Sequence, residues 1–271
     1  MNILFSLLAS VFFLFCANAK ERNYTGSTPA GTIVRSFLGI AFTDSVDFIR
    51  WKLNVQDGRY SLKCNYGIGK PNTNGFINDG KWINLEGRLE KKQNKYLLQR
   101  DNKILKMIEV NSNLLHLLDK HNNLLVGNDG WSYTLNSETP QVNDQLNLLS
   151  KQTKLKDSMT FQGRTPCLPF AYEKQSSNCY KLKWSVVFYT DPKTNMPTTY
   201  YLRGTVVDHE RKSGIWNINK GKDGRIIYRL QSANNEVLQL VVLDENIIVF
   251  TDKQGNLLAG NEDFSYTLNR K

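Results

Sequence analysis

Residues 119–136 read DKHNNLLVGNDGWSYTLN, and residues 252–269 read DKQGNLLAGNEDFSYTLN. The two stretches are identical at 12 of 18 positions, at a constant offset of 133 residues. So close a match between two parts of one chain indicates an internal duplication. The chain is therefore predicted to contain two similar units in tandem.

The match extends upstream of this stretch. Alternating apolar residues correspond at the same offset, Ile49, Trp51, Leu53 and Val55 with Leu182, Trp184, Val186 and Phe188. Gly80-Lys81-Trp82 matches Gly214-Ile215-Trp216 at offset 134, and the copies begin at YTGSTP (24–29) and FQGRTP (161–166). We therefore assign residues 20–136 to a first repeat and 161–271 to a second.

Residues 137–160 have no counterpart in the duplication. The segment is polar and contains Pro140, which is typical of a linker between independently folded units. Its Leu146, Leu148 and Leu149 either dock on a domain or form a helical turn, and the sequence leaves both possibilities open.

Within each copy, apolar residues recur at every second position. Tyr180, Leu182 and Trp184 alternate with Lys181 and Lys183, as in a half-buried antiparallel strand. Roughly eight short strands per copy, separated by turn-rich stretches, indicate an all-β fold of two small antiparallel meander barrels. Residues 30–42 and 167–177, which follow each Thr-Pro, lack this pattern, and we expect a short helix or lid there across one barrel mouth.

Trp51 and Trp184 lie on the apolar phase of the best alternating strands, opposite Arg50, Lys52 and Lys183. We interpret both as core residues rather than as ligand-stacking residues, because strict alternation in both copies needs a buried inner face. The duplication assigns four further aromatic residues to the core: Trp82, Trp216, Tyr133 and Tyr266.

Cys167 and Cys179 occur only in the second copy, where the first has Ala30 and Val46. Two cysteines that are bonded to each other are expected to be present or absent together, so we predict a disulfide between Cys167 and Cys179. A metal or redox site is a weaker interpretation, because the spacing is neither CxxC nor ordinary zinc spacing. Cys64 lies on the apolar face of its strand and is predicted to be a buried free thiol.

Residues 3–15 form an uncharged apolar run that is followed by Ala17-Asn18-Ala19, a small-residue cleavage pattern. We therefore predict a signal peptide over residues 1–19 and export to the periplasm, the outer membrane surface or the extracellular space. A membrane anchor needs roughly 20 apolar residues, so we expect no transmembrane segment after processing. Lipidation at Cys16 is the alternative, and the bulky Phe15 before it argues against it.

The chain has 35 Lys and Arg against 25 Asp and Glu, a formal net charge of +10. With 40% hydrophobic residues, this composition excludes a disordered chain. The basic residues are spread over polar strand faces and turns, which indicates a solvated surface. Contact with an anionic lipid or envelope polymer is the second interpretation, and export disfavours nucleic acid as a partner.

None of the three histidines, His116, His121 and His209, has a histidine at its counterpart in the other copy; Val249 and Gln254 match the first two. The chain contains no nucleophile elbow, HExxH, phosphate loop or dinucleotide fingerprint. We therefore predict no catalytic residue, no metal ligand and no cofactor.

Two pairs of carboxylates recur in both copies: Asp119 with Asp252, and Asp129 with Glu262. A secreted hydrolase that uses such residues is conceivable. Turn formation explains Asp119 and Asp252 more simply, because an aspartate bonds backbone two residues ahead.

Five motifs of the second copy carry a family resemblance: FxGRTPC (161–167), CYKLKW (179–184), PTTY (197–200), GxW (214–216) and the run 255–269. With them, the chain resembles exported envelope proteins similar to the N-terminal domain of the copper-resistance lipoprotein NlpE. The resemblance covers the second copy well and the first more loosely. It implies lipocalin-like barrels in the periplasm or outer membrane of a Gram-negative bacterium.

In that family, a CxxC motif after the proline is linked to metal and redox sensing. Here Cys167 matches the first cysteine, Phe170 stands at the second, and the first copy has Ala30. Copper binding and stress signalling are therefore not carried over.

The sequence favours a non-enzymatic binding or interaction protein of the cell envelope. Its expected partner is a small apolar ligand or an envelope polymer or lipid. The alternatives are a secreted hydrolase that uses Asp and Glu positions, and an envelope stress or copper-related sensor.

Overall fold

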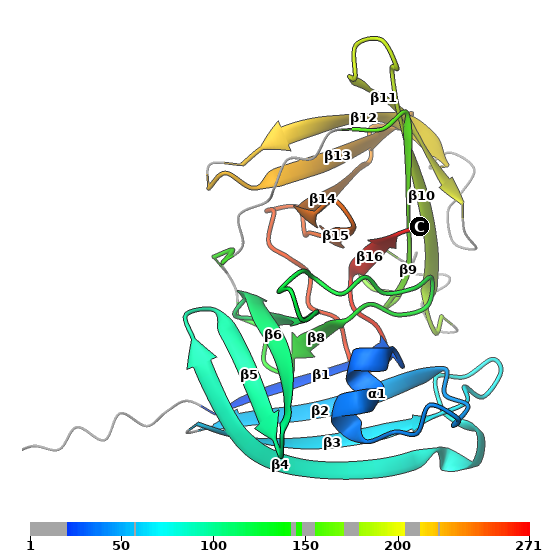
Figure 1. The fold of residues 1–271 in the computed structure, drawn as a ribbon. Helices are drawn as coiled ribbons and strands as arrows, with labels where there is room; N and C mark the ends of the chain where they lie inside the picture. Colours follow the sequence, from blue (N-terminus) through cyan, green and yellow to red (C-terminus); the bar gives the residue numbers. More distant parts are fainter. Residues whose placement is uncertain are drawn as a thin grey trace, which may run out of the picture.

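The computed structural model describes residues 21–271 except for residues 57, 142–144, 148–154, 171–178, 204–211 and 222. The predicted signal peptide, Cys16 and His209 lie outside the described residues. Within this part of the chain, two closed antiparallel barrels follow one another (Figure 1). The predicted fold class is thereby confirmed.

The first barrel is a meander in which each strand pairs with the next and β8 closes on β1. A helix, α1 (Thr32–Leu38), follows β1, and a 3-10 turn, η1 (Ile77–Asp79), precedes β4. The strands are β1 (Arg22–Pro29), β2 (Phe48–Gln56), β3 (Arg59–Gly67), β4 (Lys81–Lys92), β5 (Lys95–Arg100), β6 (Lys103–Asn111), β7 (Leu114–Leu118) and β8 (Thr134–Ser137).

The second barrel repeats this order, and β16 closes on β9. It begins at Ser158 rather than at residue 161, because β9 extends upstream along β10. Its strands are β9 (Ser158–Thr165), β10 (Leu182–Thr190), β11 (Pro197–Arg203), β12 (Ser213–Lys220), β13 (Ile226–Ser232), β14 (Val237–Asp244), β15 (Ile247–Phe250) and β16 (Thr267–Arg270).

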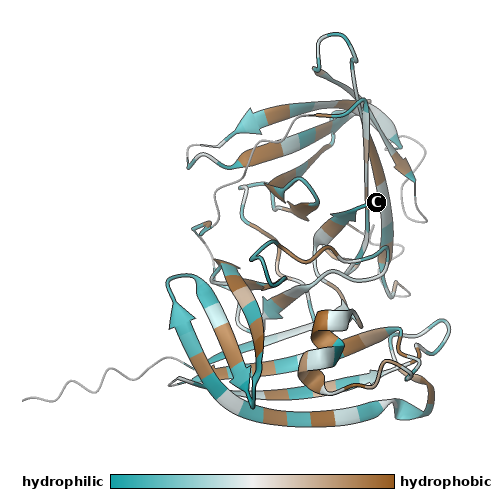
Figure 2. Cartoon of the chain, in the orientation of Figure 1, coloured by the Kyte–Doolittle hydropathy of each residue, from teal (hydrophilic) through white to brown (hydrophobic). Residues whose placement is uncertain are grey.

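Hydropathy alternates along the strands (Figure 2). The apolar residues of the alternation form a buried core in each barrel. Trp51 is completely buried, and its indole Nε1 donates to Thr28 Oγ1 at 2.9 Å. Trp184, 8% exposed, donates to Thr165 Oγ1 at 2.8 Å in the same way. The duplicated Thr-Pro motif and the duplicated tryptophan therefore form one unit in each barrel, in which the threonine satisfies a buried indole N–H.

Tyr133, Tyr266 and Trp216 also lie in the barrel cores. Trp82 does not: it is 56% exposed on the outer face of β4, and its ring lies 4.6 Å from the Lys63 ammonium. The assignment of Trp82 to the core was therefore wrong.

Strand register explains the error. Gly87 pairs with Tyr60 and Gly214 pairs with Tyr200, and a Cβ at either glycine would meet the tyrosine ring at 2.7 Å and 2.9 Å respectively. Gly214-Ile215-Trp216 therefore corresponds to Gly87-Arg88-Leu89, and not to the stretch that contains Trp82. The sequence match had aligned two unrelated Gly-x-Trp triplets.

In the first copy, the segment after Thr-Pro contains the expected helix. Gly39 ends α1 with a positive φ of 75°, which favours glycine at this position. Val34, Phe37 and Leu38 are buried in the barrel core. In the second copy, residues 167–170 are described and residues 171–178 are not, so the prediction for 167–177 lies largely outside the described residues.

The two barrels contact each other through equivalent residues. Asn136 Oδ1 accepts from Gly260 N at 2.8 Å, and its Nδ2 donates to Asn261 O at 3.1 Å. Asn269, its counterpart, makes the matching bonds with Gly127 N at 2.8 Å and Asn128 O at 3.4 Å. Two hydrogen bonds join equivalent hydroxyl groups across the interface. Ser132 Oγ lies 2.7 Å from Ser265 Oγ, and Thr134 Oγ1 lies 3.0 Å from Thr267 Oγ1. The interface thus has an approximate two-fold symmetry.

An apolar cluster continues this interface and draws on both barrels: Val110, Leu114, Val241, Leu243, Ile247, Val249 and Leu257. Leu146 of the linker packs against it, and Asn147 N donates to Val110 O at 2.8 Å. Because the two barrels share this apolar cluster, we now expect them to unfold together and not as independent units.

His116 lies fully buried in the same interface. Its Nε2 is 2.9 Å from the Leu125 carbonyl oxygen, which can only accept, so Nε2 carries the proton. Nδ1 then accepts from the Thr134 hydroxyl at 2.9 Å. Burial lowers the pKa of His116 to about 4, so the imidazole is neutral at pH 7.

We predict that Trp51→Ala lowers the free energy of unfolding by about 3–5 kcal/mol, because it leaves a large cavity. Trp82→Ala, the matched control, should cost at most about 1 kcal/mol, since it removes only an exposed ring and its contact with Lys63. Urea denaturation measures both values. Equal losses in the two variants would contradict the assignment of these residues to core and surface.

We also predict that His116 makes the stability depend on pH. In the unfolded chain this histidine has a pKa of about 6.5 and is protonated below that pH. In the folded chain its pKa is about 4, so it stays neutral down to about pH 4. The stability that the neutral, folded histidine contributes is present above pH 6.5 and is lost as the pH falls. The loss amounts to about 2.5 kcal/mol at pH 4.5.

His116→Val, which copies Val249, should remove this loss, so that the difference in unfolding free energy between pH 7 and pH 4.5 shrinks by that amount. His121→Gln, which copies Gln254 in an exposed turn, is the control and should keep the wild-type difference. An unchanged pH dependence in His116→Val would refute the prediction.

Candidate functional site

A cavity of about 620 Å³ lies at the mouth of the second barrel. Its walls come from the β13–β14 hairpin, the turn after β15, and the chain that follows Thr165-Pro166. The lining residues are Pro169, Phe170, Tyr200, Ser232, Asn235, Glu236, Val237, Leu238, Gln239, Thr251, Asp252, Lys253 and Gln254. The cavity thus combines apolar walls with polar side chains from the surrounding turns.

Phe170 forms the aromatic side of this cavity. Its ring centroid lies 5.4 Å from that of Trp184, 4.9 Å from that of Phe250 and 5.8 Å from that of Tyr266. The Tyr266 hydroxyl donates to the Leu168 carbonyl oxygen, which fixes the chain beside Phe170. Phe170 therefore fills part of the mouth and leaves the rest to the cavity.

The predicted disulfide between Cys167 and Cys179 is present, with a Cα–Cα distance of 6.1 Å. It ties the chain before Phe170 to the residues that lead into β10. Phe170 N also donates to the Cys167 carbonyl oxygen at 3.0 Å. The disulfide therefore holds Phe170 in the mouth. Cys64 is free and buried, and burial raises its pKa well above the ordinary value.

The corresponding mouth of the first barrel is filled by α1. Phe37 lies with its ring centroid 6.4 Å from that of Tyr60, the counterpart of the cavity residue Tyr200. Val34 and Leu38 are buried in the same core. The two barrels therefore share a frame, and among the described residues the mouth of the first holds a helix and that of the second holds Phe170.

The opposite end of the first barrel holds a buried network of charged and phenolic groups, which the sequence analysis missed. Glu109, 6% exposed, accepts from Arg22 Nη1 at 2.7 Å, Lys91 Nζ at 2.7 Å and the Tyr96 hydroxyl at 3.1 Å. Burial by itself raises the pKa of Glu109, but the hydrogen bonds from Lys91 and Arg22 outweigh it and hold the pKa below its ordinary value.

Arg22 and Lys91 both pair with Glu109, so the buried carboxylate of this network has its charge compensated. At the counterparts, the second barrel has only apolar and phenolic side chains: Met159, Ile218, Tyr228 and Val242. A signal for the network was available in the sequence, since Glu109 falls on the apolar phase of Leu105 and Met107.

The recurring aspartates serve turns. Asp119 Oδ1 accepts from the backbone N–H groups of His121 and Asn123, each at 2.8 Å. Asp252, which lines the cavity, accepts from the backbone of Gln254 and Asn256 at 2.9 Å. In both turns the second carboxylate oxygen is taken by an asparagine side chain. These bonds leave neither carboxylate poised for proton transfer.

Of the other recurring pair, Glu262 lies at the surface, 3.7 Å from Lys52 Nζ. Among the described residues, no group of three or more His, Cys, Asp and Glu side chains is placed to hold a metal ion.

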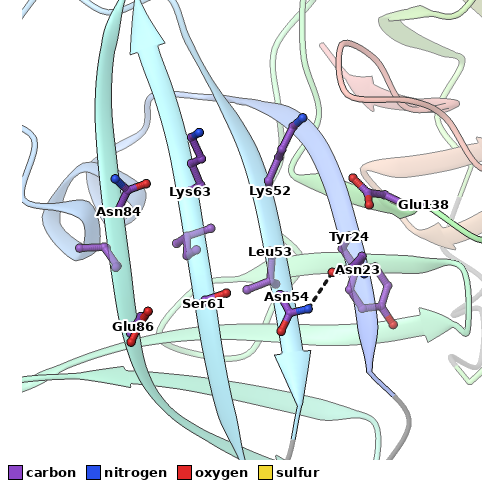
Figure 3. A pocket seen from close by; sticks show the side chains of 12 residues that line it. Asn23, Tyr24, Lys52, Leu53, Asn54, Ser61, Lys63, Asn84, Glu86 and Glu138 are labelled. Atoms are coloured by element: carbon purple, nitrogen blue, oxygen red, sulfur yellow. Dashed lines mark hydrogen bonds between the residues drawn. The ribbon is translucent and has the colours of Figure 1, made fainter.

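A second hollow, about 410 Å³, lies on the outer face of β1–β4. Figure 3 shows Lys52, Lys63, Asn84 and Glu86 spread along this face rather than directed at a common point. Residues of opposite charge therefore form a solvated surface here, as expected for the polar phase of the strands.

No family model, curated protein or solved structure matches this chain. The resemblance to the N-terminal domain of NlpE stays a prediction. In the described part of the chain, no helix has the length and apolar character needed to cross a bilayer.

We predict that Cys167→Ser with Cys179→Ser lowers the unfolding free energy by about 3 kcal/mol, because the unfolded chain loses a loop closure of 12 residues. Denaturant titration of this double variant and the wild type gives the difference. Alkylation of the unfolded, unreduced wild type should label Cys64 alone in the mature chain. Labelling at position 167 or 179 would rule out the bond in solution.

Proposed function

We propose that this chain is an exported, non-enzymatic binding protein of the cell envelope, and that its second barrel holds a small apolar ligand. The observation that carries the proposal is the cavity of about 620 Å³ at the mouth of that barrel. Its volume lies in the range of small-molecule sites, about 300–1,000 Å³.

The chemistry of the lining favours an apolar molecule with a polar end. Phe170, Val237 and Leu238 offer apolar surface, and burial of such surface drives binding. Ser232, Asn235, Gln239 and Thr251 supply hydroxyl and amide groups at the edge of the cavity, where they can orient a polar end.

Export is supported by the apolar N-terminal run with its small-residue cleavage pattern. The disulfide fits the same assignment, since such bonds persist in oxidising compartments. Phe170 stands where the family that the sequence resembles has its second cysteine, and its place in an aromatic cluster favours ligand binding over copper sensing.

The competing hydrolase would use Asp252 and Glu236, which both line the cavity. The turn bonds of Asp252 disfavour it, because a general base must be free to accept a proton.

The test is a fluorescence titration of the mature chain with N-phenyl-1-naphthylamine, a neutral apolar probe. We expect saturable binding to one site, and Leu238→Glu should weaken it by at least about tenfold, because a charge enters the apolar wall. Ile104→Glu is the control: Ile104 is 55% exposed on the strand of the first barrel that corresponds to β14.

Circular dichroism and melting temperature establish that both variants fold. Equal affinity for the probe in Leu238→Glu and Ile104→Glu would overturn the proposed site. Turnover of fluorogenic esters that is lost in Asp252→Asn would support the hydrolase instead.

A further inference from the structure

A separate cleft of about 420 Å³ lies where the two barrels meet. The first barrel contributes Asp47, Phe48, the loop that begins at Gly69, and the turn before β8. From the second barrel come Arg164, Lys181, Asp263 and Phe264. The cleft therefore exists only in the assembled pair of barrels.

An aromatic stack forms one wall. Phe76 stacks on Phe48 at 4.2 Å between ring centroids, and Phe48 stacks on Trp131 at 4.6 Å. The guanidinium carbon of Arg164 lies 5.0 Å from the centroid of the Trp131 ring. Phe48 and Phe76 are buried and support the half-buried Trp131, whose ring holds the Arg164 guanidinium at the cleft.

Lys181 is the second cation at the cleft, with its ammonium 5.8 Å from the Phe264 ring centroid. Burial lowers the pKa of Lys181, and the positive charges of Arg164 and Lys183 lower it further, against the opposing effect of the Asp263 carboxylate. The described residues include no carboxylate within ion-pair distance of either Arg164 or Lys181. Two like charges thus lie close together without an ion pair of their own, although Asp47 and Asp263 also line the cleft.

Asp263 lies near enough to raise the pKa of Lys181, but its carboxylate forms its ion pair elsewhere. It pairs with Arg50 Nη2 and accepts from Asn74 Nδ2 at 2.9 Å. Two cations that line one cleft and form no ion pair with a described carboxylate are typical of a site that is completed by an anion.

We propose that this cleft binds the phosphoryl group of a small soluble phosphorylated molecule. A phosphate monoester carries about −1.5 to −2 charges at pH 7, which matches Arg164 and Lys181 together, whereas a carboxylate would neutralise only one of them. The fork of the Arg164 guanidinium suits paired phosphate oxygens. Lys70, Asn72 and Thr73 of the first-barrel loop line the same cleft and offer further donors.

The site spans both barrels, so an anion bound there would also stabilise their association. Arg164 and Lys181 have Ser27 and Phe48 as counterparts in the first copy. The charge is therefore specific to one side of the approximate two-fold axis, and we expect a single site per chain.

The experiment is isothermal titration of the mature chain with inorganic phosphate at low ionic strength, with acetate at matched ionic strength as the comparator. We expect saturable binding of one phosphate and at least about tenfold weaker binding of acetate. Arg164→Gln with Lys181→Gln should weaken phosphate binding at least about tenfold, since each charged hydrogen bond is lost.

Lys120→Gln with Lys193→Gln removes the same charge from exposed turns and serves as the matched control. An equal loss of phosphate affinity in both double variants would show a diffuse effect of net charge and would overturn the site. The absence of saturable phosphate binding to the wild type would overturn it as well. Arg164→Lys keeps the charge without the fork and should give an intermediate affinity.

Vesicles of phosphatidylcholine with and without phosphatidic acid distinguish a lipid source of the phosphoryl group. Sedimentation with the acidic vesicles alone, without binding of inorganic phosphate, would overturn the small-molecule assignment. Arg164→Gln with Lys181→Gln should still bind N-phenyl-1-naphthylamine at the second barrel, so this proposal and the proposed function can fail separately.

Discussion

Asn136 and Asn269 impose the central constraint on this structure. Each asparagine donates to and accepts from the backbone of the other barrel, so one surface patch must complement a near copy of itself. Such self-complementary contacts are typical of two-fold symmetric dimers. Here they join two halves of one chain, and the apolar cluster, the docked linker residue Leu146 and the cleft between the barrels all depend on that pairing.

This constraint also explains which part of the duplication is best preserved. Strand residues inside a barrel tolerate exchange of one apolar side chain for another of similar volume, as in Leu53 and Val186. Hydrogen bonds between two copies of one patch do not, because each partner must keep its donors and acceptors in place. The stretch 119–136 contains Ser132, Thr134 and Asn136, and its close match to 252–269 reflects the contact between the barrels.

Much of the fold could be predicted from the sequence, since a period of two fixes which strand face is buried, and the joint loss of Cys167 and Cys179 indicated their bond. Trp82 was misassigned because a short motif carries no register, and register is set by pairing partners far away in the chain, such as Tyr60 with Gly87. The cavity was not predictable for a related reason. Its walls come from separate turns and from Phe170, whose position depends on the disulfide and the aromatic cluster.

The reciprocal interface has a consequence for assembly. If the barrels were separate proteins, each would expose a self-complementary interface, and their association would depend on concentration. The covalent connection through residues 138–157 turns that encounter into an intramolecular one, with a high effective concentration of the partner patch. The tether therefore also keeps the patch from recruiting other molecules, and it lets the two halves diverge. One mouth is filled by a helix, and the described residues of the other line a cavity.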